Sequence, residues 1–141
     1  MSRILGVDYG ARRIGLALSD ETATIAQALE QFAVESDEAV IQKISEIVTE
    51  RGVSKVVVGL PRNMDGSYGP QAKKVLEFVE CLRAQTSVSV ETWDERLTTV
   101  AAERVMLEGD LSRAQRKVRR DKIAAQMLLQ GYLDARAERD R

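Results

Sequence analysis

The stretch that decides the fold is ILGVDYGARRIGLALS, residues 4–19. Residues 4–8 are mostly apolar and predict a short strand, a turn follows around Gly10, and residues 13–19 predict a second strand. Together they predict a β-hairpin whose first strand ends on an acidic residue, Asp8. An opening hairpin of this kind favours a sheet that begins with antiparallel strands.

Beyond the hairpin, strand and helix patterns alternate. Residues 26–34 are ambiguous, because their propensities favour a helix although a third strand also fits. Residues 37–51 carry a helical apolar stripe that Gly52 is suited to end. Residues 55–60 contain three consecutive valines, which is typical of a strand buried on both faces. The polar segment PRNMDGSYG, residues 61–69, predicts a surface loop.

The rest of the chain continues the alternation. The further expected elements are a helix around residues 72–82, a strand over 88–93, a helix from Thr98 or Thr99 to about Leu107, a basic loop, and a last helix from about Arg120 to Ala137. This order predicts an α/β fold with a mixed sheet and helices on its faces. We expect one domain over residues 1–141, with a tail at 137–141 that frays.

Composition limits the chemistry that the chain can perform. With no histidine among 141 residues, Ser-His-Asp and Cys-His catalysis and histidine-ligated zinc are excluded. The single cysteine, Cys81, forms no internal disulfide, and we expect it to be a small buried residue of a helix. Without a membrane-spanning stretch or a signal peptide, the sequence predicts a cytoplasmic protein with no membrane partner.

Acidic residues end three of the expected elements. Asp8 ends the first strand between two glycines, where it could approach a phosphate or metal or could merely stabilise the turn. Asp94 and Glu95 follow a strand, although such acids are often only a solvated turn. Asp121 begins the face of the last helix that should pack on the sheet, but it could also serve the helix dipole. Carboxylates without histidine suit Mg²⁺ or Mn²⁺, bound as one ion or as a pair.

Cations accompany these acids although the net charge is −1. Six basic residues and one acid lie between Arg113 and Lys122, at a helix start where positive charge opposes the helix dipole. We therefore interpret this segment as phosphate-binding rather than structural. The loop after the valine strand could offer amides and Ser67 to a phosphate, or could be an ordinary turn at Asp65.

These residues match a known family. The segments that carry the match are Gly6-Val7-Asp8-Tyr9-Gly10 with Arg13-Ile14-Gly15, Val58-Gly59-Leu60-Pro61 with Asn63-Met64-Asp65-Gly66-Ser67, Asp94-Glu95-Arg96-Leu97-Thr98-Thr99, and Asp121 through Ala125 with Tyr132. In this order they resemble the YqgF (RuvX) family of pre-16S ribosomal RNA nucleases, also described as Holliday junction resolvases.

The resemblance implies a ribonuclease H-like fold: a mixed five-stranded sheet with three antiparallel strands first, then parallel strands, and helices on both faces. It also implies that residues 26–34 are the third strand. The family's catalytic and metal-binding triad would fall on Asp8, Glu95 and Asp121, with Asp94 not excluded in place of Glu95. The residues expected to bind nucleic acid are Arg12, Arg13, Asn63, Ser67, Arg96, Arg113, Arg116, Lys117, Arg119 and Arg120.

The expected function is that of a divalent-metal-dependent endonuclease acting on structured RNA or branched DNA. Its substrate would be the 5′ end of pre-16S rRNA, a Holliday junction, or both; junction resolution would favour a homodimer. One alternative is a non-catalytic RNA- or ribosome-associated factor with a vestigial site. Another is nucleotide binding, as in two-domain ATPases with a similar sheet, but 141 residues supply only one such domain.

Overall fold

The computed structural model describes residues 2–10, 12–97 and 113–139, with side chains of the last helix described from residue 124 onward. Its elements, in order, are β1 (Arg3–Tyr9), β2 (Arg13–Ser19), β3 (Ala26–Ala33), α1 (Asp37–Arg51), β4 (Val53–Leu60), α2 (Pro70–Gln85), β5 (Ser89–Asp94), the 3-10 turn η1 (Glu95–Leu97) and α4 (Arg113–Arg139). None of the helices in these ranges is long and apolar enough to cross a membrane.

The strands form one five-stranded sheet in the order β3-β2-β1-β4-β5. β1 pairs antiparallel with β2, and β2 with β3, whereas β4 lies parallel to both β1 and β5. The predicted mixed sheet is therefore confirmed, and the ambiguous segment is a strand, Ala26–Ala33. Its sequence favours a helix only weakly, and pairing with β2 along its whole length decides its conformation.

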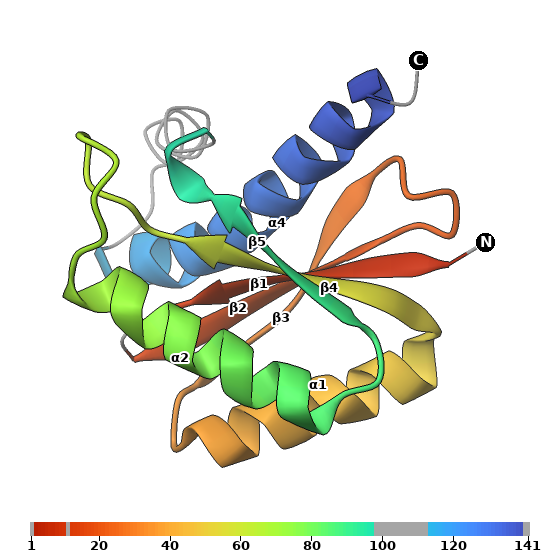
Figure 1. The fold of residues 1–141 in the computed structure, drawn as a ribbon, viewed down its shortest axis with the longest axis horizontal. Helices are drawn as coiled ribbons and strands as arrows, with labels where there is room; N and C mark the ends of the chain where they lie inside the picture. Colours follow the sequence, from red (N-terminus) through yellow and green to blue (C-terminus); the bar gives the residue numbers. More distant parts are fainter. Residues whose placement is uncertain (1, 11, 98–112, 140–141) are drawn as a thin grey trace.

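Helices α1 and α2 cover one face of the sheet (Figure 1). Ser36 caps α1 by accepting a hydrogen bond from the Ala39 amide at 3.1 Å, and Gly52 ends the helix in a left-handed conformation with φ +66°. Phe78 from α2 and Ile44 from α1 are fully buried in the core on this face. Burial of the apolar faces of α1 and α2 against the sheet stabilises the central strands β1 and β4.

Helix α4 crosses the other face of the sheet, as the blue ribbon in Figure 1 shows. Leu128, Leu129 and Tyr132 of this helix are buried against the sheet. The helix approaches the sheet closely at Gly6, where an added Cβ atom would lie 2.8 Å from Leu129 Cβ. A glycine in the middle of β1 is therefore required by the packing of α4.

Two predictions about local structure were wrong. Cys81 is exposed, because the stripe Ala72, Val75, Phe78, Val79 and Leu82 faces the sheet and position 81 lies outside it. The last helix begins at Arg113 rather than near Arg120, so the expected basic loop is helical. Residues 113–120 contain no glycine or proline, and arginine, lysine, glutamine and alanine are good helix formers.

Two other expectations fall wholly or partly outside the described residues. The helix expected from Thr98 or Thr99 to about Leu107 lies among residues 98–112, which the structure does not describe. Of the tail expected at residues 137–141, residues 137–139 belong to helix α4, and residues 140–141 lie outside the described residues.

The contact at Gly6 gives a test of the packing between α4 and the sheet. Replacing Gly6 with Ala should lower the free energy of unfolding by about 1–3 kcal/mol, because the added methyl group forces α4 away from β1. Urea denaturation measures the effect. Gly69→Ala is the matched control. A Cβ atom added at Gly69 would have the exposed Asn63 side chain as its nearest neighbour, at 3.4 Å, so it should displace no helix. Equal stability of the Gly6→Ala protein and the wild type would contradict the close packing.

Candidate active site at the carboxyl edge of the sheet

Three parallel strands bring acidic residues to one edge of the sheet. β1, β4 and β5 run in the same direction, so their carboxyl ends meet there. Asp8 lies one residue before the end of β1. Asp94 ends β5 opposite Leu60 of β4, and Glu95 follows at the first position of η1. Residues 87 positions apart in the sequence thereby become neighbours.

Asp8 and Glu95 form a carboxyl pair. Their side chains share a hydrogen bond, and the pKa of Glu95 is raised to about 8. The largest cause is burial of the Glu95 carboxyl, followed by the negative charge of Asp8, the hydrogen bond to it, and the charge of Asp94. The pair therefore holds a proton more strongly than a lone carboxyl group does, and the Glu95 carboxyl donates the hydrogen bond to Asp8.

Gly59 of β4 creates the space for this pair. A Cβ atom at this position would collide with the Glu95 carboxyl oxygen Oε1 and with the Leu128 side chain of α4. The missing side chain lets the Glu95 carboxyl lie over β4, toward Asp8 on the neighbouring strand β1. Sequence reasoning used Gly59 only as part of a family motif and did not predict this role.

Asp94 has a different environment from its neighbour. Arg96 binds it with both Nε and Nη2, the latter at 2.6 Å, and Arg62 Nη1 lies 3.7 Å from the same carboxylate. The hydrogen bonds from Arg96 hold the pKa of Asp94 below its usual value despite partial burial. The sequence left Asp94 and Glu95 as alternatives, and it is Glu95 that contacts Asp8 in the structure.

The loop between β4 and α2, residues 61–69, lies beside this edge and is held by internal hydrogen bonds. Asn63 Nδ2 donates to Ser67 Oγ at 3.0 Å, and Asp65 Oδ1 accepts from both the amide and the hydroxyl of Ser67. Arg62 donates from Nε to the Gly66 carbonyl at 3.0 Å. The side chains of Asn63 and Ser67, expected to bind nucleic acid, thus also shape the loop, and Arg62 is an additional residue that the sequence analysis did not select.

The direction of α4 carries its early residues toward the same edge. Gln130 contacts Ala26 and Thr24, near the start of β3, whereas Ala125 and Leu128 lie against the middle of β1 and the end of β4. Asp121 precedes Ala125 by one helical turn. Only its backbone is described, so the structure brings together two members of the expected triad and leaves its carboxyl group outside the described side chains.

The other expected nucleic-acid contacts divide into two groups. Arg12 and Arg13 are exposed at the turn between β1 and β2, next to the end of β1 that carries Asp8. Five basic residues lie in the first part of α4, where the structure describes the backbone alone; they are Arg113, Arg116, Lys117, Arg119 and Arg120. Helical structure there places these positions on one continuous element that leads to Asp121.

The donor set at this edge fits a hard divalent cation. Asp8 and Glu95 offer carboxylate oxygens, which Mg²⁺ and Mn²⁺ prefer, and a cation would relieve the repulsion that now keeps a proton on Glu95. Among the side chains that the structure describes, no group of three or more such ligands converges. The described pair supplies two such ligands, and the carboxyl group of Asp121, the third expected ligand, lies outside the described side chains.

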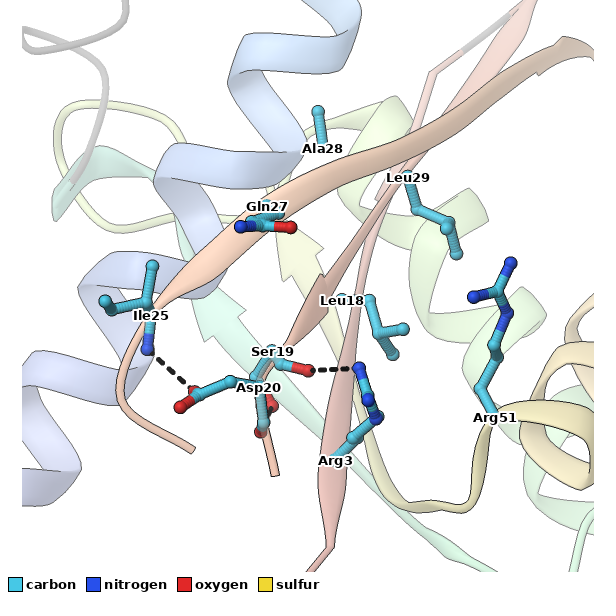
Figure 2. Close-up of a pocket in the computed structure, with 9 residues that line it drawn as sticks. All are labelled: Arg3, Leu18, Ser19, Asp20, Ile25, Gln27, Ala28, Leu29 and Arg51. Carbon is cyan, nitrogen blue, oxygen red and sulfur yellow. Dashed lines mark hydrogen bonds between the residues drawn. The ribbon is translucent and has the colours of Figure 1, made fainter. Parts of the chain in front are cut away.

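A cavity of about 270 Å³ lies at the opposite end of β1 (Figure 2). Arg3, Arg51 and Ile25 line it together with neighbouring residues of β2 and β3. Arg3 is five residues from Asp8 along an extended strand, or roughly 17 Å. This cavity is therefore separate from the acidic pair.

The comparison with known proteins decides the family. Residues 2–135 match the family described as "RuvX: Holliday junction resolvase". This chain belongs to the RuvX family. A relative from Symbiobacterium thermophilum, named "Putative pre-16S rRNA nuclease", is 53% identical over 137 residues, covering 97% of this chain and 95% of its own length. A relative of the same name from Pelotomaculum thermopropionicum is 49% identical and covers 94% and 87%. The expected family and the nuclease class of enzyme are confirmed.

Solved structures confirm the fold. A Thermus thermophilus RuvC in complex with a Holliday junction substrate aligns with a TM-score of 0.61, covering 98% of this chain and 97% of that one at 17% identity. A fowlpox virus resolvase in complex with Holliday junction DNA aligns with a TM-score of 0.52 at 13% identity, covering 94% and 97%. These proteins share the sheet and helix arrangement of this chain.

The raised pKa of Glu95 predicts how stability depends on pH in chelator. Between pH 4.5 and about 8 the folded protein holds a proton that the unfolded chain has lost, so the free energy of unfolding falls as pH rises. The loss from pH 5 to pH 9 should be on the order of a few kcal/mol. Glu95→Gln should abolish most of this loss of stability. Urea denaturation at pH 5 and at pH 9 measures the free energy of unfolding of both proteins.

The exposed helix residue Glu46 supplies the matched control. Glu46→Gln should retain the wild-type fall in stability from pH 5 to pH 9. If the Glu95→Gln protein lost as much stability as this control between pH 5 and pH 9, the carboxyl pair would not exist in solution.

Proposed function

We propose that this RuvX protein is a divalent-metal-dependent endonuclease whose active site is centred on Asp8 and Glu95, with Asp121 as the third acid. The observation that carries the proposal is the half-buried carboxyl pair at the carboxyl edge of the sheet. Such a pair is unfavourable for folding, because burial and mutual repulsion raise the pKa of Glu95 far above its normal value. A cation bound between the two carboxyl groups would relieve this repulsion, so the pair is suited to binding a cation.

Mg²⁺ or Mn²⁺, as one ion or two, would be held by Asp8, Glu95 and Asp121. When bound, such an ion supplies charge stabilisation to a phosphodiester undergoing hydrolysis and lowers the pKa of water. The protein's own contribution is to fix the two carboxyl groups: β1 holds Asp8, and η1 holds Glu95 over Gly59. Metal binding requires the Glu95 proton to leave, so acidic conditions should weaken binding.

The neighbouring cations would position the nucleic-acid strand. Arg12 and Arg13 stand exposed at the turn that follows β1, and the basic positions of α4 precede Asp121 on the same helix. Contacts of this kind neutralise phosphates without reading sequence. Arg96 binds Asp94 and also lies 3.5 Å from the Asn63 and Met64 carbonyl oxygens, so it links the loop to β5 as well as offering charge at the site.

The substrate that we propose is structured RNA, and specifically the 5′ end of pre-16S rRNA. Support comes from the names of relatives at about 50% identity that match nearly the whole chain. The family description also names Holliday junctions, so a four-way DNA junction is the competing substrate. Junction resolution would require two copies to cut symmetrically, and a homodimer belongs to that version of the proposal.

A cleavage assay with purified protein tests the metal-dependent site. Wild type should cut a pre-16S rRNA fragment or a four-way DNA junction with Mg²⁺ or Mn²⁺ and should not cut in chelator. Asp8→Asn should lower the rate by roughly 100-fold or more, since it removes a ligand charge at the metal site. Mapping both substrates side by side identifies the preferred one.

Glu46→Gln in α1 is the control and should cut at the wild-type rate, because this exposed acid lies outside the site. Unchanged cleavage by the Asp8→Asn protein would refute the proposed site. Tight RNA binding without any metal-dependent cleavage by wild type would instead favour a non-catalytic RNA-associated factor.

A further inference from the structure

Exposed apolar side chains gather beside the acidic pair. Among the residues that the structure describes, the large apolar side chains classed as exposed are Met64 (94%), Leu97 (65%), Ile25 (57%) and Tyr68 (49%). Ile25 lies at the remote cavity. The other three, Met64, Tyr68 and Leu97, come from the loop after β4 and from η1, and we name them the apolar rim.

Two arginines connect the members of the rim to one another. Arg96 Nη1 lies 3.5 Å from the carbonyl oxygens of both Asn63 and Met64, and Leu97 follows Arg96 directly in η1. The guanidinium of Arg62 stacks on the Tyr68 ring, with its carbon Cζ 4.8 Å from the ring centroid. Both arginines also contact Asp94. The rim is therefore joined to the residue next to Glu95.

The loop presents Met64 in a defined position. Gly66 donates its amide to the Asn63 carbonyl at 2.8 Å, which closes a β-turn with Met64 at its second position, and Gly66 adopts φ +87°. The amide of Asn63 donates to the Ser67 carbonyl at 3.0 Å and closes the base of the loop. These bonds use backbone groups and polar side chains only. The Met64 side chain is left in water, so internal packing does not explain an apolar residue at this position.

We propose that the apolar rim contacts the faces of unstacked bases next to the cleavage site, so that this enzyme selects strands whose bases are open there. The inference rests on the proposed nuclease function and adds what the enzyme recognises. In a continuous duplex the base faces are covered by stacking, and a protein can reach only base edges, sugars and phosphates. At a bulge, a single-stranded end or a junction the faces are accessible to apolar and aromatic side chains.

The charges around the rim agree with this partner. Arg62 and Arg96 bring two guanidinium groups to the base of the loop, where they can meet sugar and phosphate while Met64 and Leu97 reach the bases. Arg62 and Arg96 join the rim to Asp94, the residue before Glu95, so a strand bound in the site would pass beside the rim. Selection of an open strand then follows from the shape of the loop rather than from hydrogen bonds to particular bases.

The test is a binding comparison in chelator, where cleavage does not occur. Two RNA hairpins of the same length, closed by the same compact tetraloop, are labelled for fluorescence anisotropy. One has a fully paired stem, and the other has a stem with a bulge that contains 2-aminopurine. Wild type should bind the bulged hairpin more tightly and change the 2-aminopurine fluorescence. Met64→Ser should weaken binding to the bulged hairpin about ten-fold and reduce the fluorescence change, with less than a two-fold effect on the paired hairpin.

Two further variants complete the experiment. Leu97→Ser should act in the same direction as Met64→Ser, and Ile25→Ser is the matched control because its exposed side chain lies at the other end of β1. Met64 is almost fully exposed, so its replacement should leave the folded structure and the melting temperature unchanged. If Met64→Ser and Ile25→Ser proteins discriminate between the hairpins as wild type does, the inference is overturned.

The two proposals fail in different ways. If wild type cleaves with metal but the rim variants keep full discrimination, the nuclease function stands and base contact by the rim is wrong. If the rim variants lose discrimination while cleavage survives the Asp8→Asn change, base contact stands and the proposed catalytic site is wrong.

Discussion

The site depends on one unfavourable interaction, the close approach of the half-buried Asp8 and Glu95 carboxyl groups. Their repulsion and burial keep a proton on Glu95 up to a pH of about 8. The rest of the fold supplies what is needed to maintain this arrangement. Two parallel pairings, β1 with β4 and β4 with β5, fix the distance between the strands that carry the acids. The two hydrophobic layers stabilise that central part of the sheet.

Two glycines connect the packing of the core with the chemistry of the edge. Gly6 lets α4 approach β1, and Gly59 leaves room for both Leu128 of α4 and the Glu95 carboxyl. The helix that fills the second core is thus the same helix whose earlier turns lead to Asp121 and the basic positions. Close packing of α4 and assembly of the acidic site are consequently two results of the same contacts. A change that moves α4 should alter both stability and metal affinity.

Much of the fold could be predicted from local patterns. The hairpin, the valine strand and the α1 stripe ending at Gly52 are each specified by adjacent residues, and all three are confirmed. The segment Ala26–Ala33 could not be assigned from its own residues because pairing with β2 decides it; only the family resemblance indicated a strand. The prediction of a basic loop before the last helix is wrong, because residues 113–120 are helical and consist mostly of good helix formers.

The candidate site was predictable only in part, because contacts between distant residues decide part of it. Residue types identified Asp8 and the pair Asp94 and Glu95, but spacing could not choose within that pair, because the choice depends on which neighbours each side chain meets. Arg62 and Arg96 occupy Asp94, and Gly59 opens the path from Glu95 to Asp8. The roles of Arg62 and Gly59 arise from contacts across strands and loops, which no local pattern contains.

The most direct measurement of the central claim is the number of protons released when Mn²⁺ binds. Calorimetric titrations at pH 7 in buffers of different ionisation enthalpy give this number. The account predicts release of close to one proton per site in wild type, since Glu95 must lose the proton that it shares with Asp8. Glu95→Gln should bind Mn²⁺ more weakly and release almost none. Tight Mn²⁺ binding by wild type without proton release, or with the same release from the Glu95→Gln protein, would contradict it.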